Sequence, residues 1–261
     1  MKNLNIIKLI FSIILILLKT NTLKSHELWI EGKNYQLKNN EHFIANIKVG
    51  QDLLGESFPF INSETELYLL KNNKTKQILK QRDGDFPAIK QKINQEGFNI
   101  IYYQSTPEFL NYENLDKFKF FIKEYNLDYK NKYTSPPKES YQRFAKTIFF
   151  KNKSNFYKQS PELEFEILNL NNPFNETKSK IKVVLNNKPF QNKKIIVFFR
   201  NNKMFKKKNY ITNINGEVEV NTLNKGFYLI SAVDLKENNF LDKIKLKTDF
   251  YSRWASLTFE K

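Results

Sequence analysis

The chain has 261 residues and no cysteine, and its 43 lysines and arginines outnumber 27 aspartates and glutamates, which gives a formal net charge of +16. An apolar fraction of 40%, with 24 Phe and 13 Tyr, can fill hydrophobic cores and excludes global disorder. The lack of cysteine excludes disulfides, cysteine-based zinc sites and thiol chemistry, and only two histidines exclude a three-histidine metal centre within one chain.

Residues 1–25 are typical of a signal peptide that is removed on export. Lys2 and Lys8 supply the positive charge, residues 9–18 supply the apolar run, and Ser25 is small enough for a leader peptidase. Ten residues of helix rise about 15 Å, half of a bilayer core, so a permanent membrane span is not expected. We expect a periplasmic protein whose membrane contact is limited to this cleaved leader.

Cleavage after Ser25 would make His26 the first residue of the mature chain. Its free amine and ring nitrogen would then form a bidentate ligand for a transition metal. The alternative is an ordinary polar residue at a frayed terminus. The cleavage position is also open, since Leu23 is bulky for the position two before the cut. Cleavage after Leu23 would leave a Lys-Ser-His start, which also binds copper or nickel, whereas cleavage after Thr22 would remove both arrangements.

The mature chain of 261 − 25 = 236 residues is long enough for one large or two ordinary domains, and two are expected. The first, residues 26–155, is predicted to be a β-rich domain with one inserted helix. Apolar and alternating runs predict strands over 26–37, 41–50, 64–71, 98–104 and 144–150, and a surface loop is expected over 126–140.

The inserted helix is indicated by apolar residues that recur at helical spacing between Leu115 and Tyr125. Asn111 or Asn114 is a suitable N-cap for it. Trp29 in the first strand and Trp254 near the end of the chain are expected to be core residues.

The first two strands are expected to pair as a hairpin, which separates the two histidines. His42 then lies opposite Leu37, which is eleven residues along the first strand from His26, or roughly 36 Å at about 3.3 Å per residue. A metal site that joins both histidines is therefore not expected. Because the same hairpin brings the end of the second strand close to His26, Asp52 is the predicted second metal ligand.

The second domain, residues 160–261, is predicted to be an immunoglobulin-like or transthyretin-like β-sandwich. Seven short apolar or alternating runs, separated by Asn, Pro and Gly turns, occur within about 100 residues. They are residues 162–168, 180–185, 194–200, 210–212, 216–220, 227–234 and 256–259. Lys206, Lys207 and Lys208 are interpreted as a solvated hairpin tip.

Two further groups of charged residues have an ordinary interpretation beside a functional one. Asp83 and Asp85 flank Gly84, and their carboxylates suit a hard cation, but a solvated turn is favoured. Arg143 and Lys146 carry charge that a ligand could contact, but solvation by water is favoured.

A series of short motifs follows in order along the mature chain. It includes His-Glu-Leu-Trp-Ile-Glu at 26–31, Gly-Asp-Phe-Pro-Ala at 84–88, Glu-Ser-Tyr-Gln-Arg-Phe-Ala-Lys at 139–146 and Arg-Trp-Ala-Ser-Leu-Thr-Phe at 253–259. In order and spacing, these motifs resemble those of exported bacterial proteins of unknown function described as NikM-like. The resemblance implies export, a two-part β architecture and a role in nickel or cobalt uptake, and it implies no reaction.

The chain departs from the NikM-like pattern in one loop. Relatives carry an additional histidine before the Glu-Ser-Tyr segment, whereas residues 126–138 contain none here. If that histidine binds metal in the relatives, this chain has one ligand fewer.

The sequence contains no nucleophile elbow, no phosphate loop and no histidine near a marked serine, so we expect no enzyme activity and no organic cofactor. It favours a protein that binds a divalent transition metal, nickel, cobalt or copper, for uptake or handling, with an inner-membrane metal transporter as partner. The alternative is a non-catalytic structural or protein-interaction β-sandwich module of the cell envelope.

Nucleic acid is not an expected partner despite the positive charge. Lysines dominate the basic residues and are scattered, and arginine, the usual reader of bases and phosphates, occurs only at Arg82, Arg143, Arg200 and Arg253. An exported protein also meets little nucleic acid.

Overall fold

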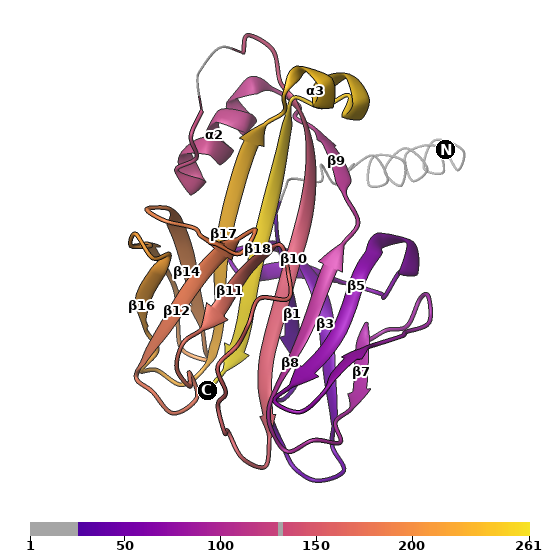
Figure 1. The fold of residues 1–261 in the computed structure, drawn as a ribbon, viewed down its shortest axis with the longest axis vertical. Coiled ribbons are helices and arrows are strands. Elements are labelled where there is room, and N and C mark those ends of the chain that lie inside the picture. The colour runs from indigo at the N-terminus through magenta and orange to yellow at the C-terminus, as the bar shows by residue number, and fades with distance from the viewer. Residues whose placement is uncertain (1–25, 130–132) are drawn as a thin grey trace, which may run out of the picture.

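The computed structural model describes residues 26–129 and 133–261 and shows a mainly β protein, as predicted (Figure 1). The predicted signal peptide, residues 1–25, lies outside the described residues. A ten-stranded sheet forms the centre. Its main path is β15 (Phe205–Ile211), β14 (Lys194–Arg200), β17 (Phe227–Glu237), β18 (Phe250–Glu260), β10 (Lys138–Lys151), β8 (Gly97–Ser105), β5 (Thr65–Asn72) and β6 (Lys76–Ile78), and β2 (Gln36–Leu37) and β9 (Glu108–Asn111) also pair with β10.

A four-stranded sheet covers one face of the central sheet. It consists of β1 (Glu27–Gly32), β3 (His42–Gln51), β4 (Leu54–Phe58) and β7 (Ile89–Lys92). The space between this sheet and the central sheet is filled by a first hydrophobic core. Successive side chains of a strand point to opposite faces of the sheet, and Tyr141, Ala145 and Phe149 of β10 belong to this first core. Trp29 and Trp254 belong to the same core and are 0% and 3% exposed, which confirms the predicted role of both tryptophans.

A second four-stranded sheet packs over the opposite face of the central sheet. It contains β11 (Phe165–Asn169), β12 (Lys178–Leu185), β13 (Lys188–Pro189) and β16 (Glu217–Asn221). A second hydrophobic core lies between this sheet and the central sheet. Phe144 and Ile148 of β10, whose side chains point to the opposite face from Ala145 and Phe149, belong to it. Since both faces of β10 are covered, nearly all of its residues are buried.

The two parts of the chain that the sequence separates share this central sheet. The expected boundary, between residues 155 and 160, falls in the loop that joins β10 to β11. Across it, β10 from the first part pairs in parallel with β18 from the second, with Glu139 opposite Phe250 and Thr147 opposite Thr258. Independent folding of the second part stays a prediction of the sequence.

The predicted helix is confirmed as α2 (Leu115–Tyr125). The side chain of Asn114 accepts a hydrogen bond from the backbone N–H of Lys117 and caps the helix, and Asn126 in the left-handed conformation ends it. Phe121 stacks on Trp254 with ring centroids 5.4 Å apart, so α2 packs on the end of the central sheet.

Two short helices were not predicted, η1 (Asn62–Glu64) and α3 (Phe240–Leu246). The α3 helix projects near one end of the longest axis of the molecule (Figure 1). Within the described residues, none of the helices combines the length and the hydropathy needed to cross a bilayer.

The structure corrects the interpretation of several charged residues as solvated. Lys146 and Arg143 are only 1% and 4% exposed, because they lie on β10 between the two covering sheets. Residues 206–208 are exposed, as predicted, but they lie within strand β15 and pair with β14 instead of forming the tip of the hairpin. Asp83, by contrast, lies in the predicted turn, where its carboxylate accepts hydrogen bonds from the backbone and side chain of Asn62.

Candidate functional site

A cavity with a volume of about 800 Å³ lies between the first strand and the α2 region. His26 and Gln51 line it on one side, and β9, α2 and the segment between them line it on the other. The lining is rich in aromatic rings, namely Phe109, Tyr112, Phe120, Phe121 and Tyr125. A concave cavity that combines aromatic rings with several polar groups is a usual form of a small-ligand site.

The hairpin register places His26 on the cavity wall. In β1 and β3, Glu27 pairs with Gly50 and Gly32 with Ala45, so His26 comes next to Gln51 just beyond the last pair. The β3–β4 turn follows directly, with Asp52 and Leu53 both in the left-handed conformation. The predicted hairpin is thus confirmed over residues 27–32 and 45–50, and Gln51 lies near His26 as expected, whereas residues 36–37 pair with β10 instead.

Two buried glutamates hold tyrosines of the cavity wall. Tyr125 donates a hydrogen bond of 2.5 Å to Glu27, and Tyr112 donates one of 2.6 Å to Glu139. Burial raises the pKa of each carboxyl to about 7, although the tyrosine hydrogen bond opposes the effect. The hydroxyls of both tyrosines are therefore engaged, and their rings are fixed in the wall of the cavity.

Asp52, the predicted second ligand, lies close to the cavity but forms an ion pair. Its carboxylate is 3.0 Å from the ammonium group of Lys207, which also lies 2.8 Å from the carboxylate of Glu124. Glu124 lines the cavity, whereas Asp52 does not contribute to the lining. Glu113, Asp116 and Glu124 are the carboxylates that line the cavity with His26.

The structure keeps the second histidine away from this site, as the sequence predicts. His42 begins β3 and pairs with Lys92 of β7, whereas Gln51, beside His26, ends the same strand. Nine residues of strand span about 30 Å. Within residues 26–129 and 133–261, no group of three or more His, Asp or Glu side chains is arranged to hold a metal ion.

The sequence did not point to Glu27, Tyr112, Glu139 or Glu124 as site residues. Glu27 and Tyr125 are 98 residues apart in sequence, and Tyr112 and Glu139 are 27 apart. Only tertiary contacts bring these partners together. The Asn114 cap was the one local signal in this region, because it indicates where α2 begins and therefore that Tyr125 lies on this helix.

Comparison with known protein families assigns the chain to a family without assigning a function. The model of a family described as domain of unknown function (DUF4198) matches residues 23–234. No curated protein matches the chain. The protein therefore belongs to the DUF4198 family, and any activity must be argued from its own residues.

Proposed function

We propose that this DUF4198 protein is exported to the periplasm and binds one divalent transition metal ion, nickel, cobalt or copper, for uptake or handling. The observation that carries the proposal is the position of His26 on the wall of the cavity beside α2. The resemblance of its motifs to NikM-like proteins supports the same function. An inner-membrane metal transporter is the corresponding partner.

The donor atoms near His26 suit such an ion once the leader is removed. Cleavage before His26 would place a free amine and an imidazole on one residue, and nitrogen donors favour nickel and copper over harder cations. Glu124 and Gln51 line the same cavity and offer oxygen donors. Since side chains alone form no three-residue metal group within the described ranges, the amine is the donor that the proposal needs.

The export step has a direct test. We expect N-terminal sequencing of the protein from the native envelope fraction to begin at His26, because Ser25 is the small residue at the end of the leader. A chain that keeps Met1 and stays in the membrane would contradict export and would also leave His26 without a free amine.

Metal binding should depend on His26 and on its position at the terminus. Isothermal calorimetry of the mature protein with Ni²⁺ or Cu²⁺ at pH 7.5 should show one ion per chain, with an affinity that falls as the pH is lowered, because protons compete for both nitrogens. His26→Ala should weaken binding by on the order of 100-fold, since it removes a strong donor. One extra alanine before His26 should do the same, although it leaves the imidazole in place.

The matched control is His42→Ala, which removes the other histidine, an exposed one at the far end of β3. Its affinity for Ni²⁺ should equal that of the unaltered protein. Equal affinities for all four proteins would show that the terminus is not the site. The alternative function, a protein-interaction module of the envelope, would then be favoured.

A further inference from the structure

The α3 helix contributes nothing to either core. None of its seven residues is buried. Its large apolar side chains face solvent instead: Phe240 is 77% exposed, Leu241 73% and Ile244 61%. Several exposed apolar residues within two turns of helix are unusual on a protein surface and mark a surface that contacts something else.

The structure holds this helix firmly from its base. Asn238, which is 6% exposed, donates hydrogen bonds from its side chain to the carbonyl oxygen of Thr248 at 3.1 Å and to its hydroxyl at 2.9 Å. Asn239 caps the helix by accepting a hydrogen bond from the N–H of Asp242. A seven-residue helix is not stable on its own, so these contacts fix α3 in place while its apolar side stays outside.

The positions of the residues around α3 form an amphipathic pattern. At 100° per residue, Phe240, Ile244 and Leu241 occupy one arc of about 100°. Lysines follow on both sides of this arc, at Lys243 and Lys245, and Asp242 lies opposite together with the less exposed Leu246. Apolar side chains flanked by lysines are typical of helices that lie in the interface of a bilayer with anionic lipids.

The charge next to the apolar arc suits an anionic surface. Lys245 and Lys247 are exposed, as is Lys236 on the strand before the helix. Lys243 is 2.8 Å from the carboxylate of Glu237, so its charge is balanced locally. Because α3 projects near one end of the longest axis (Figure 1), it can meet a planar surface with the rest of the molecule standing away from it.

We propose that α3 docks the protein onto the surface of an anionic lipid bilayer, with Phe240, Leu241 and Ile244 inserted among the lipids and the lysines at the phosphate groups. This contact is additional to the leader, to which the sequence limited membrane contact. It does not depend on metal binding, because α3 includes no residue of the cavity.

Sedimentation of the mature protein with vesicles tests this proposal. Vesicles of phosphatidylglycerol and phosphatidylethanolamine should carry the protein down, and pure phosphatidylcholine vesicles should carry down much less, because each lysine near the surface favours anionic lipid. Leu241→Ser with Ile244→Ser should weaken binding to the anionic vesicles about 100-fold, or about tenfold for each apolar side chain removed. Lys245→Gln should weaken binding to anionic vesicles alone.

The matched control is Leu223→Ser with Ile78→Ser, which removes a leucine and an isoleucine that are 62% and 60% exposed elsewhere on the surface. It should bind vesicles as the unaltered protein does, and thermal melting should show all variants folded. Equal binding by the α3 and control variants would overturn the proposal. The proposal would also be overturned if the protein did not bind vesicles but self-associated, and the α3 variant abolished this self-association. The apolar side of α3 would then contact a second copy of the chain.

Discussion

Replacing Lys146 by methionine should destabilise the protein by about 3–5 kcal/mol, because it leaves a charged glutamate buried without its partner. The ammonium group of Lys146 lies 2.8 Å from Glu166 and 2.9 Å from the side-chain oxygen of Gln159. The side chains of Lys146 and Glu166 are 1% and 0% exposed. Urea denaturation followed by tryptophan fluorescence at pH 7.5 measures the change.

A second substitution separates the charge effect from the packing effect. Glu166 also accepts hydrogen bonds from the backbone N–H groups of Glu162 and Leu163, at 2.6 and 3.0 Å, and glutamine keeps an acceptor oxygen for them. Glu166→Gln alone should destabilise the protein by a similar amount. In the double variant neither residue of this buried pair carries a charge, so the loss should be clearly smaller than the sum of the two single losses.

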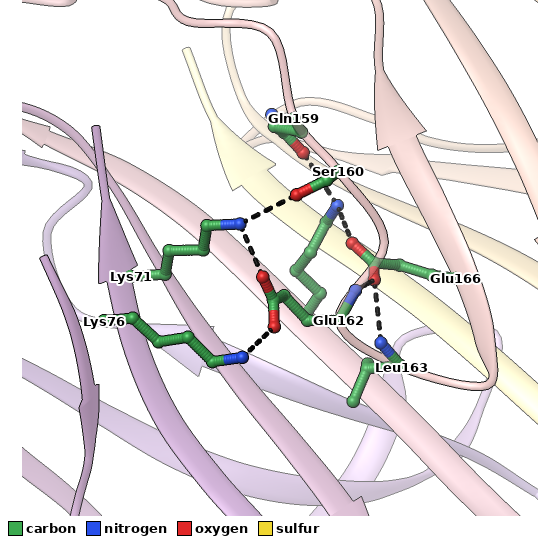
Figure 2. A network of polar contacts seen from close by, with 8 residues as sticks. Lys71, Lys76, Gln159, Ser160, Glu162, Leu163 and Glu166 are labelled. Carbon is green, nitrogen blue, oxygen red and sulfur yellow. Dashed lines mark hydrogen bonds and ion pairs between the residues drawn. The ribbon is translucent and has the colours of Figure 1, made fainter. Parts of the chain in front are cut away.

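The same network contains its own control. Lys76 forms an ion pair with Glu162 at 2.5 Å, but its side chain is 57% exposed (Figure 2). Lys76→Met should therefore change the free energy of unfolding by about 1 kcal/mol or less. Losses of equal size for Lys76→Met and Lys146→Met would mean that burial does not decide the contribution of these pairs.

Local patterns in the sequence predicted the strands and the main helix well. All seven runs expected after residue 160 overlap strands, and 194–200 matches β14 at both ends. Alternation of side chains and the Asn114 cap depend on neighbouring residues alone, which is why they are visible in one sequence. The parallel pairing of β10 with β18 joins residues 111 apart, such as Glu139 and Phe250, and no local pattern specifies it.

The predictions that were wrong also failed because a local pattern does not show tertiary contacts. Lys146 and Arg143 were interpreted as solvated because a lysine or arginine in a strand usually faces water. They are buried because the strand that carries them is covered on both faces, which depends on the shared sheet. The α3 helix was missed because its apolar residues face outward and its seven residues are too few for a periodic signal.

The candidate site was predictable where it depends on the hairpin. The pairing of β1 with β3 follows from adjacent strands, and it places Gln51 next to His26, with Asp52 following in the turn. The ion pair of Asp52 with Lys207 could not be foreseen, because Lys207 lies on a strand 155 residues later. A tertiary contact of the same kind pairs Glu124, one of three carboxylates that line the cavity, with Lys207.

The protein should be more stable at pH 5 than at pH 8, because two buried carboxyls bind a proton more tightly in the folded state. Burial raises the pKa of Glu27 and of Glu139 from 4.5 to about 7. Between these values the folded protein keeps protons that the unfolded chain has released, so stability falls as the pH rises through this range and levels off above about 7. The expected loss is about 3 kcal/mol for each group. Urea midpoints measured at intervals from pH 5 to 8 would show it.

Glutamine at these positions imitates the protonated carboxyl and tests the assignment. Glu139→Gln should raise stability at pH 8 and remove about half of the difference between pH 5 and pH 8, and adding Glu27→Gln should remove most of the rest. Glu31 and Glu162 do not interfere, because their pKa is lowered and their contribution is lost only as the pH falls below the usual carboxyl range. Glu56→Gln, at an exposed position on β4, is the control and should leave the difference unchanged. If the double variant keeps the full pH dependence, the tyrosines of the cavity wall are not held by titrating carboxyls.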